Sequence, residues 1–411
     1  MNYQIEDVFS PRSFPQNTYI SRKLDDGETV DDRLKRALSM KGNLIFVTGA
    51  SKSGKTVLCH NVISSESYIA LSGNQISTKA DFWNHIAEQL PLSDAVVLTT
   101  GEQNSNNKAS QAELKLNLGI ASLGASINSN TGNNMNQQLA MTNNRTERQI
   151  IRYLIDNNKV LVLDDFHYIA ADMQMYIART LKTELFNGLK AVIISLPHRS
   201  DDAIICNPDL IGRTTSIEIL PWSAEELRAI AVKGFALLGL QIGEAEERLL
   251  AQESIASPQL MQENCFQLAF ASVQKQLAIQ PDLVRYAFRQ TARNYAHYER
   301  LVQAIRQGPA QGIGRRKSYL LQDGAVDIYQ LLLLALKADP PVTELSLAAL
   351  KERLRQLLYT QATPSSSVIS AALNKIIKIV AELMPDLDAL EYKNQCLYIL
   401  DPFLLFYLRW K

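Results

Sequence analysis

Asn43-Leu44-Ile45-Phe46-Val47-Thr48 runs directly into Gly49-Ala50-Ser51-Lys52-Ser53-Gly54-Lys55-Thr56, and this junction predicts both a fold and a ligand site. The first half is an apolar run of strand length, the second half is a G-x-x-x-x-G-K-T loop, and a helix-like stretch from Val57 to Ile63 follows. A loop that leaves a buried strand and opens a helix directs backbone N–H groups at phosphate oxygens. The octapeptide also occurs by chance in surface turns, but this setting favours a nucleotide-binding loop.

The side chains of this loop have distinct expected roles. Lys55 would bring an ammonium group to the β- and γ-phosphates, and the Thr56 hydroxyl would ligand Mg²⁺. The glycines would allow the backbone turns that bring the amides onto the phosphates. The residues expected to contact the nucleotide here are Gly49, Ser51, Lys52, Ser53, Gly54, Lys55, Thr56 and Val57. The segment therefore predicts binding of ATP or GTP together with Mg²⁺.

The composition indicates a globular chain with more than one core. With 411 residues, of which 46% are hydrophobic and 20% charged, two or three domains are expected. Lys plus Arg and Asp plus Glu number 42 each, so no overall field attracts nucleic acid or acidic lipid. DNA contact would therefore need a local basic patch.

The cysteines and the apolar runs indicate the cellular compartment in which the protein is expected. Cys59, Cys206, Cys265 and Cys396 are far apart and fit neither a metal-ligand spacing nor a disulfide framework. The N-terminus lacks the basic and apolar regions of a signal peptide, and the longest apolar run, Leu331 to Leu336, is too short to cross a bilayer. We therefore expect a cytoplasmic protein without a membrane-spanning segment.

Two further apolar runs end in polar residues. Lys159 to Leu163 leads into Asp164-Asp165, Lys190 to Ile194 leads into Ser195, and a helical pattern from Ala171 to Phe186 lies between them. Continuous apolar runs that alternate with helices are typical of a parallel sheet buried on both faces. In such sheets ligands bind beyond the carboxyl ends of the strands, where Gly49, Asp164 and Ser195 all fall.

The two aspartates supply the acids that a phosphoryl-transfer site needs. Asp164 is expected to hold Mg²⁺, and Asp165 to polarise the attacking water. The alternative is that one of them caps the short helix that follows. Ser195 would sense the γ-phosphate or be an ordinary turn residue, and His198 and Arg199 could face the nucleotide or belong to the turn.

Arg213 lies just before the last strand-like run of this domain. It could reach the γ-phosphate bound by a neighbouring subunit as an arginine finger, or it could be a solvated surface residue. Both interpretations fit its position in the sequence.

The chain divides into five predicted parts. They are an N-terminal segment, 1–40, packed on the core domain; a nucleotide-binding core, 41–220, with a polar insertion at 100–145; a helical lid, 221–305; a linker, 306–324; and a C-terminal domain, 325–411. The insertion is rich in Asn, Ser, Gly and Gln, which favours a solvated loop, although a hairpin is the alternative.

The lid and the C-terminal domain are predicted to be helical. A capping box at Ser223 starts the first lid helix, and the expected lid helices are Glu225–Leu238, Glu244–Glu253, Pro258–Gln274 and Asp282–Arg306. The C-terminal helices are expected at 326–337, 345–359 and 364–383, the last with Thr363 as N-cap, and a hairpin at 389–400 follows. Three helices and a hairpin predict a winged helix. Asn374, Lys375 and Lys378 of its third helix, and Arg315, Arg316 and Lys317 of the linker, could contact phosphates, or the helix could present a solvated face.

The order of these motifs resembles the AAA+ and STAND group of P-loop ATPases, closest to the archaeal-type and origin-recognition-like ATPases that carry a winged helix behind a helical lid. Gly49 to Thr56 matches Walker A, and Val160 to Asp165 matches a Walker B that ends in two aspartates, as in STAND proteins. Ser195 corresponds to sensor 1, and Gly212-Arg213 to the arginine-bearing box before the last core strand.

Three further segments carry the resemblance. Thr18 to Arg22 is similar to the segment that packs on the adenine base, which implies a nucleotide contact for Arg22. Ala256-Ser257-Pro258 resembles the Gly-x-Pro element of the lid, with Ala in place of Gly, and implies a nucleotide contact for Pro258; no clear sensor 2 arginine follows it. The ending, Leu397 to Trp410, is similar to the Asp-Pro-hydrophobic-Tyr-x-Arg-Trp closure of archaeal-type ATPases.

The resemblance implies an AAA+-like α/β P-loop NTPase fold and a molecular switch that binds and hydrolyses ATP with Mg²⁺. Such a switch would form homo-oligomers and regulate a partner protein, and bacterial antiviral defence is the setting we favour. The alternative is a DNA-binding initiator or transposition regulator that acts through the winged helix. A nucleotide-binding scaffold that does not hydrolyse ATP is a third hypothesis.

Overall fold

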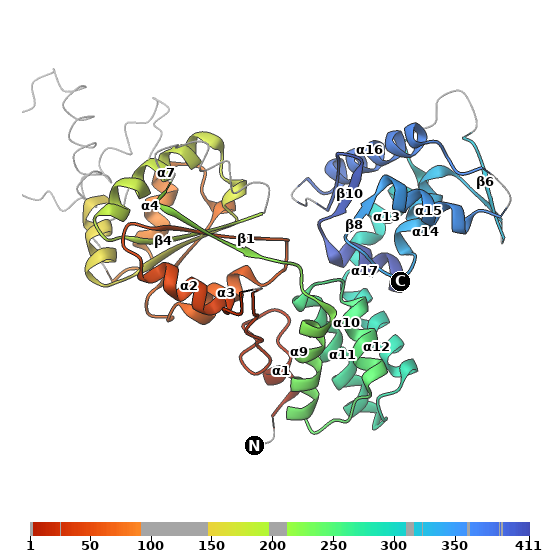
Figure 1. Cartoon of the computed structure of the whole chain (residues 1–411), viewed down its shortest axis with the longest axis horizontal. Helices are drawn as coiled ribbons and strands as arrows, with labels where there is room; N and C mark the ends of the chain where they lie inside the picture. Colours follow the sequence, from red (N-terminus) through yellow and green to blue (C-terminus); the bar gives the residue numbers. More distant parts are fainter. Residues whose placement is uncertain are drawn as a thin grey trace, which may run out of the picture. The chain divides into compact units, whose positions relative to one another are not determined.

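The computed structural model describes residues 3–24, 26–91, 147–196, 212–309, 316–322, 324–359, 362–385, 387 and 389–411. They form two compact units (Figure 1). The sheet unit comprises Lys23–Gly49 and Lys55–Ile219, and the helical unit comprises Met1–Arg22, Ala50–Gly54 and Leu220–Lys411. Among the described helices, none combines the length and apolar character needed to span a bilayer. The predicted insertion at 100–145, His198 and Arg199 lie outside the described residues.

The core of the sheet unit is a parallel five-stranded sheet. Its strands are β1 (Leu44–Gly49), β2 (Tyr68–Ser72), β3 (Val160–Asp164), β4 (Lys190–Ser195) and β5 (Thr214–Ile219). Their order in space is β2-β3-β4-β1-β5, and every neighbouring pair is parallel. The predicted α/β P-loop NTPase fold is confirmed, with the G-x-x-x-x-G-K-T loop directly after β1. β2 was not among the predicted strands.

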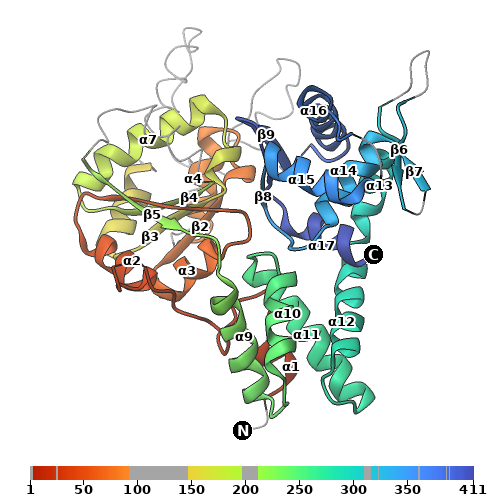
Figure 2. The same ribbon diagram turned by 45° about the vertical axis from the view of Figure 1, so that its right-hand side comes forward.

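Helices cover both faces of this sheet (Figures 1 and 2). They are α2 (Val30–Ser39) and α3 (Lys55–Val62) on one face and α4 (Lys79–Ala87) and α7 (Ala171–Phe186) on the other. Along β1, Ile45 and Val47 pack with α2 and α3, whereas Leu44 and Phe46 pack with α4 and α7. Because side chains alternate across a strand, burial on both faces requires the uninterrupted apolar run that the sequence shows.

A helical bundle forms the first part of the helical unit. Its helices are α9 (Ala224–Leu237), α10 (Glu244–Glu253), α11 (Pro258–Lys275), α12 (Pro281–Asn294) and α13 (Glu299–Gln307). Ser223 and Glu226 form the predicted capping box ahead of α9. The prediction of one helix from Asp282 to Arg306 is wrong, because the chain leaves α12 and passes through a 3₁₀ turn before α13. The turn buries Tyr298, whose hydroxyl donates a hydrogen bond to the Asp401 carboxylate.

Short strands and four helices form the rest of the helical unit. They are β6 (Tyr319–Leu321), β7 (Gly324–Val326), α14 (Ile328–Lys337), β8 (Glu344–Ser346), α15 (Leu347–Leu357), α16 (Ser366–Leu383), β9 (Leu390–Lys393), β10 (Cys396–Ile399) and α17 (Pro402–Trp410). The three predicted helices and the hairpin are present, and β8 adds a third strand to the hairpin sheet. α16 starts later than predicted, because the Ser365 hydroxyl rather than Thr363 caps it. The winged-helix assignment itself stays a prediction.

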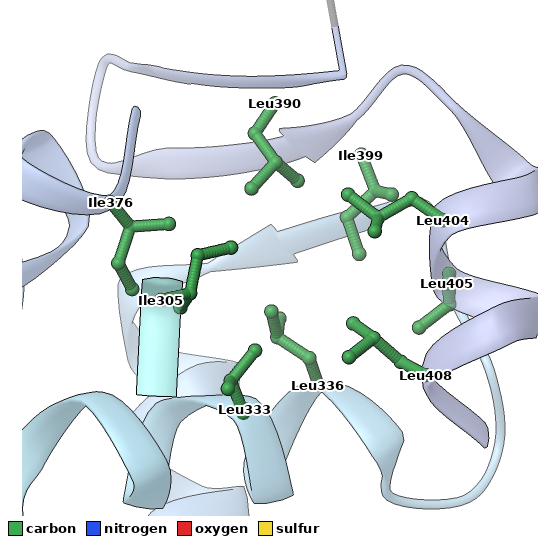
Figure 3. Close-up of a pocket in the computed structure, with 9 residues that line it drawn as sticks. All are labelled: Ile305, Leu333, Leu336, Ile376, Leu390, Ile399, Leu404, Leu405 and Leu408. Atoms are coloured by element: carbon green, nitrogen blue, oxygen red, sulfur yellow. The ribbon is translucent and has the colours of Figure 1, made fainter. Parts of the chain in front are cut away.

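A small apolar pocket shows how α13 joins the C-terminal elements (Figure 3). It is lined by Ile305, Leu333, Leu336, Ile376, Leu390, Ile399, Leu404, Leu405 and Leu408, from α13, α14, α16, β9, β10 and α17. Its volume of ≈ 10 Å³ is about what a single water needs, and its lining side chains offer no hydrogen-bond partner. It is a packing gap within one shared core.

Residues 3–22 pack on the helical unit, so the prediction that the whole segment 1–40 packs on the sheet domain is wrong for this part. Phe9 is fully buried, and its ring centroid lies 5.2 Å from that of Phe235 on α9. A Cβ on Gly234 would lie 2.2 Å from the Phe9 ring, so the glycine makes room for it. Apolar burial therefore ties the N-terminal residues to the bundle.

Candidate nucleotide-binding site

The loop after β1 has the backbone conformation that its glycine spacing predicts. Gly54 has φ +94°, a left-handed value that side chains with a Cβ rarely adopt, and Lys52 also has a left-handed backbone, with φ 62°. For a residue other than glycine, a left-handed backbone conformation costs about 1–2 kcal/mol. Gly49 and Lys55 belong to the sheet unit, and Ala50–Gly54 to the helical unit.

Lys55 is the first residue of α3 and belongs to the sheet unit. Its Nζ donates a hydrogen bond of 2.9 Å to the carbonyl oxygen of Gly49, six residues earlier. The ammonium group is therefore held at the carboxyl end of β1. The start of α3 also supplies backbone N–H groups and the positive end of a helix dipole, and both favour a bound anion.

Thr56 and Asp164 meet although 108 residues separate them in the sequence. Thr56 Oγ1 donates a hydrogen bond of 2.5 Å to Asp164 Oδ2. The structure thus brings together the hydroxyl and the carboxylate that were predicted to hold Mg²⁺. Oxygen ligands of this kind are those that Mg²⁺ prefers, so the donor set fits the metal. Beneath them, burial and the Asp164 charge raise the pKa of the Cys59 thiol, which stays protonated.

Asp165 follows Asp164 in a left-handed backbone conformation, with φ 56°. It stands in the N-cap position of the 3₁₀ turn Phe166–Tyr168, but its side chain makes no capping hydrogen bond. Its backbone N–H donates instead to Asp164 Oδ1, at 2.8 Å. The two carboxylates therefore have different surroundings, which is compatible with the different roles predicted for them.

Ser195 lies between the two parts of the site. It ends β4, the strand between β1 and β3, and its Cα pairs in register with that of Thr48. The side chain is 1% exposed, and its hydroxyl donates to the Leu196 carbonyl oxygen at 3.3 Å. Its place at the end of the strand fits both a γ-phosphate sensor and a turn residue, so the sensor role stays a prediction.

Arg213 directly precedes β5 and lies at the amino ends of the strands, opposite to the ends that carry the loop and the aspartates. Its carbonyl oxygen accepts a hydrogen bond from the N–H of Leu44, the first residue of β1. With about 3.3 Å per residue of parallel strand, β1 places Arg213 roughly 16–20 Å from Gly49. Its guanidinium lies 5.9 Å from the ring centroid of Phe186, which is 77% exposed. Arg213 therefore does not reach the loop of its own chain.

In the helical unit, Trp222 contacts the loop directly. Its Nε1–H donates a hydrogen bond of 2.8 Å to the carbonyl oxygen of Ser53. Arg22, predicted to contact the nucleotide, lies 4.8 Å above the Trp222 ring and forms an ion pair of 2.8 Å with Glu226. It also donates to the carbonyl oxygens of Leu220 and Pro221. These contacts of Arg22 fix the segment that carries Trp222. The contact of Trp222 with the loop was not predicted from the sequence.

Two further features of the helical unit lie at the loop. The Ser53 hydroxyl is buried and has no hydrogen-bond partner among the described residues. Pro258, the first residue of α11, lies 3.9 Å from where a Cβ on Gly54 would be, so the lid residue predicted at the nucleotide is beside the loop. A buried hydroxyl without a partner is costly, and a phosphate oxygen would satisfy it. The residues present fit a bound phosphate chain.

Comparison with known proteins gives structural likeness only. No family model and no curated protein matches the chain. A Walker-type ATPase of Pyrococcus abyssi is similar with a TM-score of 0.49 and 11% identity, covering 92% of this chain and 94% of that one. The ORC2 protein of Aeropyrum pernix, in ADPNP–ADP complexes, gives 0.48 and 14%, and Cdc6p of Pyrobaculum aerophilum 0.41 and 12%, each covering 98% of this chain and 97% of the other. At such identities and scores, no likeness assigns an activity.

Proposed function

We propose that this chain binds ATP with Mg²⁺ at residues 49–56 and hydrolyses it. The observation that carries the proposal is the hydrogen bond between Thr56 and Asp164, which joins the two predicted metal ligands. The unpartnered Ser53 hydroxyl adds support, because a bound phosphate would give it a partner. When bound, Mg²⁺ would neutralise charge on the phosphates.

Each residue of the site has its own task. Lys55 would move from the Gly49 carbonyl oxygen to the β- and γ-phosphates and balance their charge. Asp165 would orient the attacking water and accept its proton while the water oxygen bonds to the γ-phosphorus. The bond from phosphorus to the β–γ bridging oxygen breaks, giving ADP and phosphate. Ser195 would hydrogen-bond a γ-phosphate oxygen and so distinguish ATP from ADP.

Two variants separate binding from hydrolysis. Lys55→Ala should lose most ATP affinity, whereas Asp165→Asn should bind ATP and lose roughly 10²–10⁴-fold in turnover. Arg152→Ala is a matched control, because this side chain is 85% exposed and, among the described residues, forms an ion pair only with Asp156 on the same helical stretch. Affinity for a fluorescent ATP analogue and phosphate release provide the measurements. Lys55→Ala protein that binds ATP as tightly as the parent would refute the proposal.

We infer further that ATP hydrolysis needs a second copy of the chain. Arg213 is distant from its own loop and exposed, so any contact of its guanidinium with a nucleotide would be with the nucleotide of a neighbouring subunit. In a mixing experiment, Arg213→Ala and Asp165→Asn proteins should each be inactive alone. The mixture should regain activity, because Asp165→Asn subunits supply arginines to intact sites. Full activity of Arg213→Ala alone would exclude the arginine finger.

The oligomer would act as a nucleotide-dependent switch on a partner protein, and bacterial antiviral defence is the setting that the sequence resemblance favours. The measurement that bears on the switch is particle size in solution. Light scattering with ADP and with a slowly hydrolysed ATP analogue should give a larger particle for the analogue. Equal sizes in both states would contradict a switch based on assembly.

A second candidate function is DNA binding through the C-terminal elements. The observation that favours it is the exposed face of α16, which carries Asn374, Lys375 and Lys378. If α16 contacts phosphates, Lys375→Gln/Lys378→Gln should weaken binding to duplex DNA and reduce its salt dependence. An unchanged salt dependence would leave this helix as a solvated surface.

A further inference from the structure

Charge is divided unequally within the helical bundle of the helical unit. The first two helices, α9 and α10, carry the acids Glu225, Glu226, Glu244, Glu246, Glu247 and Glu253 and the bases Arg228, Lys233 and Arg248. Most of these acids have partners. Glu225, Glu244 and Glu247 lie within 4 Å of Arg228, Glu226 pairs with Arg22, and Glu253 pairs with Arg409. In α11 to α13 the balance is reversed, with Lys275, Arg285, Arg289, Arg293, Arg300 and Arg306 against Glu263, Asp282 and Glu299.

Three arginines of α12 share its outer face. Arg285, Arg289 and Arg293 are all exposed and follow one another at intervals of four residues. The opposite face of the helix is buried in the core through Val284, Phe288 and others. In Figures 1 and 2, α12 lies at the side of the bundle away from α9. We call these three side chains the arginine stripe.

The stripe has little internal charge compensation. Arg285 pairs with Asp282 at 3.3 Å, but both side chains are exposed, Asp282 to 95%, so solvent and salt screen the pair. Arg293 donates to the uncharged Gln290. Lys275 Nζ lies 3.4 Å from the ring centroid of Tyr286, the residue after Arg285, and adds a fourth cation. Of the three acids in α11 to α13, Glu263 is buried and Glu299 accepts a hydrogen bond from Tyr407.

We propose that the arginine stripe of α12 binds the phosphate backbone of duplex DNA. The spacing supports this partner, because residues four apart on a helix are separated by about 6.0 Å along its axis. One strand of duplex DNA carries a phosphate every ~3.4 Å of axis, so a regular row of cations can contact several phosphates of one strand. Arginine binds phosphate oxygens with two parallel N–H donors. This surface is separate from the ATP site and from α16.

Contacts to phosphates alone carry no sequence information, so the stripe should bind unrelated sequences equally. An acidic segment of a second copy is the less favoured partner, because the acids of α9 and α10 are largely paired with their own arginines. The experiment therefore measures binding both of duplex DNA and of an acidic polypeptide.

The test compares Arg285→Gln/Arg289→Gln/Arg293→Gln with a control that removes three cations elsewhere, Lys35→Gln/Arg152→Gln/Arg355→Gln. Each control residue is 60–85% exposed and, within the part of the chain that the structure describes, forms an ion pair only with a neighbour three or four residues away. Binding of two unrelated 30-base-pair duplexes is measured from 50 to 300 mM salt. Three lost contacts should reduce the slope of log affinity against log salt by about 0.9 × 3, or 2.7, and weaken binding roughly 10²–10³-fold near 0.1 M salt.

Folding of the stripe variant is checked by its thermal transition and its ATP turnover, which should equal those of the parent. Four outcomes would overturn the proposal: no DNA binding by the parent, an unchanged slope in the stripe variant, an equal loss in the control, or tighter stripe-dependent binding of polyglutamate than of DNA. Because ATP turnover is measured in the same samples, failure of the stripe and failure of the proposed ATPase are distinguishable.

Discussion

Gly73 passes so close to Asp165 that a Cβ on the glycine would lie 2.2 Å from the Asp165 carbonyl oxygen. Gly73 directly follows β2, and Asp165 directly follows β3, the neighbouring strand. A residue with a side chain at position 73 would push the backbone of Asp165 away. The glycine therefore helps to fix the residue proposed to orient the attacking water.

Gly73→Ala should lower both stability and turnover. Overpacking against a backbone atom costs roughly 1–3 kcal/mol, and the shifted Asp165 should slow hydrolysis more than it weakens ATP binding. Gly243→Ala is the control, because the added Cβ there meets only the flexible end of Glu246. Urea unfolding and turnover measure the effects. If the two alanine variants behave alike, Gly73 does not position Asp165.

Thr56→Val should weaken Mg²⁺ binding at the site, whereas Thr56→Ser should preserve it. Valine keeps the shape of the side chain but has no hydroxyl to ligand the metal or to donate to Asp164. The expected result is a large rise in the Mg²⁺ concentration needed for half-maximal ATP turnover in Thr56→Val alone. The same rise in Thr56→Ser would show that the methyl group, not the hydroxyl, matters.

The central strands could be predicted from the sequence, whereas β2 could not. Burial on both faces leaves apolar runs in β1, β3 and β4, but β2 has the exposed Ala70 at its centre and only two buried residues. Its outer edge is covered by Gln89, whose side-chain amide accepts from the Ala70 N–H and donates to the Ala70 carbonyl oxygen. The pairing of Gln89 with Ala70, 19 positions away, leaves no periodic pattern in the sequence.

The loop and its acids were likewise predictable, because a motif fixes local geometry and parallel strands bring their carboxyl ends together. The contacts of Trp222 with Ser53 and of Arg22 with Glu226 were not, since they join residues 169 and 204 positions apart. α17 was not among the predicted helices, although Asp401 caps it and Pro402 is its first residue. The same rule failed at Thr363-Pro364, where Ser365 provides the cap.

Phe9→Ala should strongly destabilise the helical unit. The ring is fully buried against Phe235 and over Gly234, so its removal leaves a cavity and should cost about 3–5 kcal/mol. Phe270→Ala is the control, because that ring is 47% exposed, and its loss should cost far less. Denaturant unfolding of both variants measures the difference. Equal small losses would mean that residues 3–22 are not part of the core.

Arg409→Lys should not rescue the loss caused by Arg409→Ala. The guanidinium donates to both carboxylate oxygens of Glu253, which is 3% exposed, and to Asp339. Removing it leaves a buried carboxylate without its cation, at a cost of about 3–5 kcal/mol. A lysine offers a single point charge and cannot reproduce the paired geometry. Stability of Arg409→Lys near that of the parent would show that charge alone suffices.

Stability should depend on pH through Asp401. Burial raises the pKa of this carboxyl above its usual 3.8, although hydrogen bonds from Tyr298 and the Phe403 N–H and the charge of Lys52 oppose the shift. Because the folded protein then binds the proton more tightly than the unfolded chain, the contribution of Asp401 to the free energy of unfolding is full below pH 3.8 and is lost as pH rises through the raised pKa.

The test uses Asp401→Asn, which cannot titrate but keeps an oxygen for the Phe403 N–H. The free energy of unfolding of the parent minus that of Asp401→Asn should therefore fall as pH rises from about 3.5 to about 7. A difference for Asp401→Asn that stays constant or grows with pH would show that burial does not control this carboxyl.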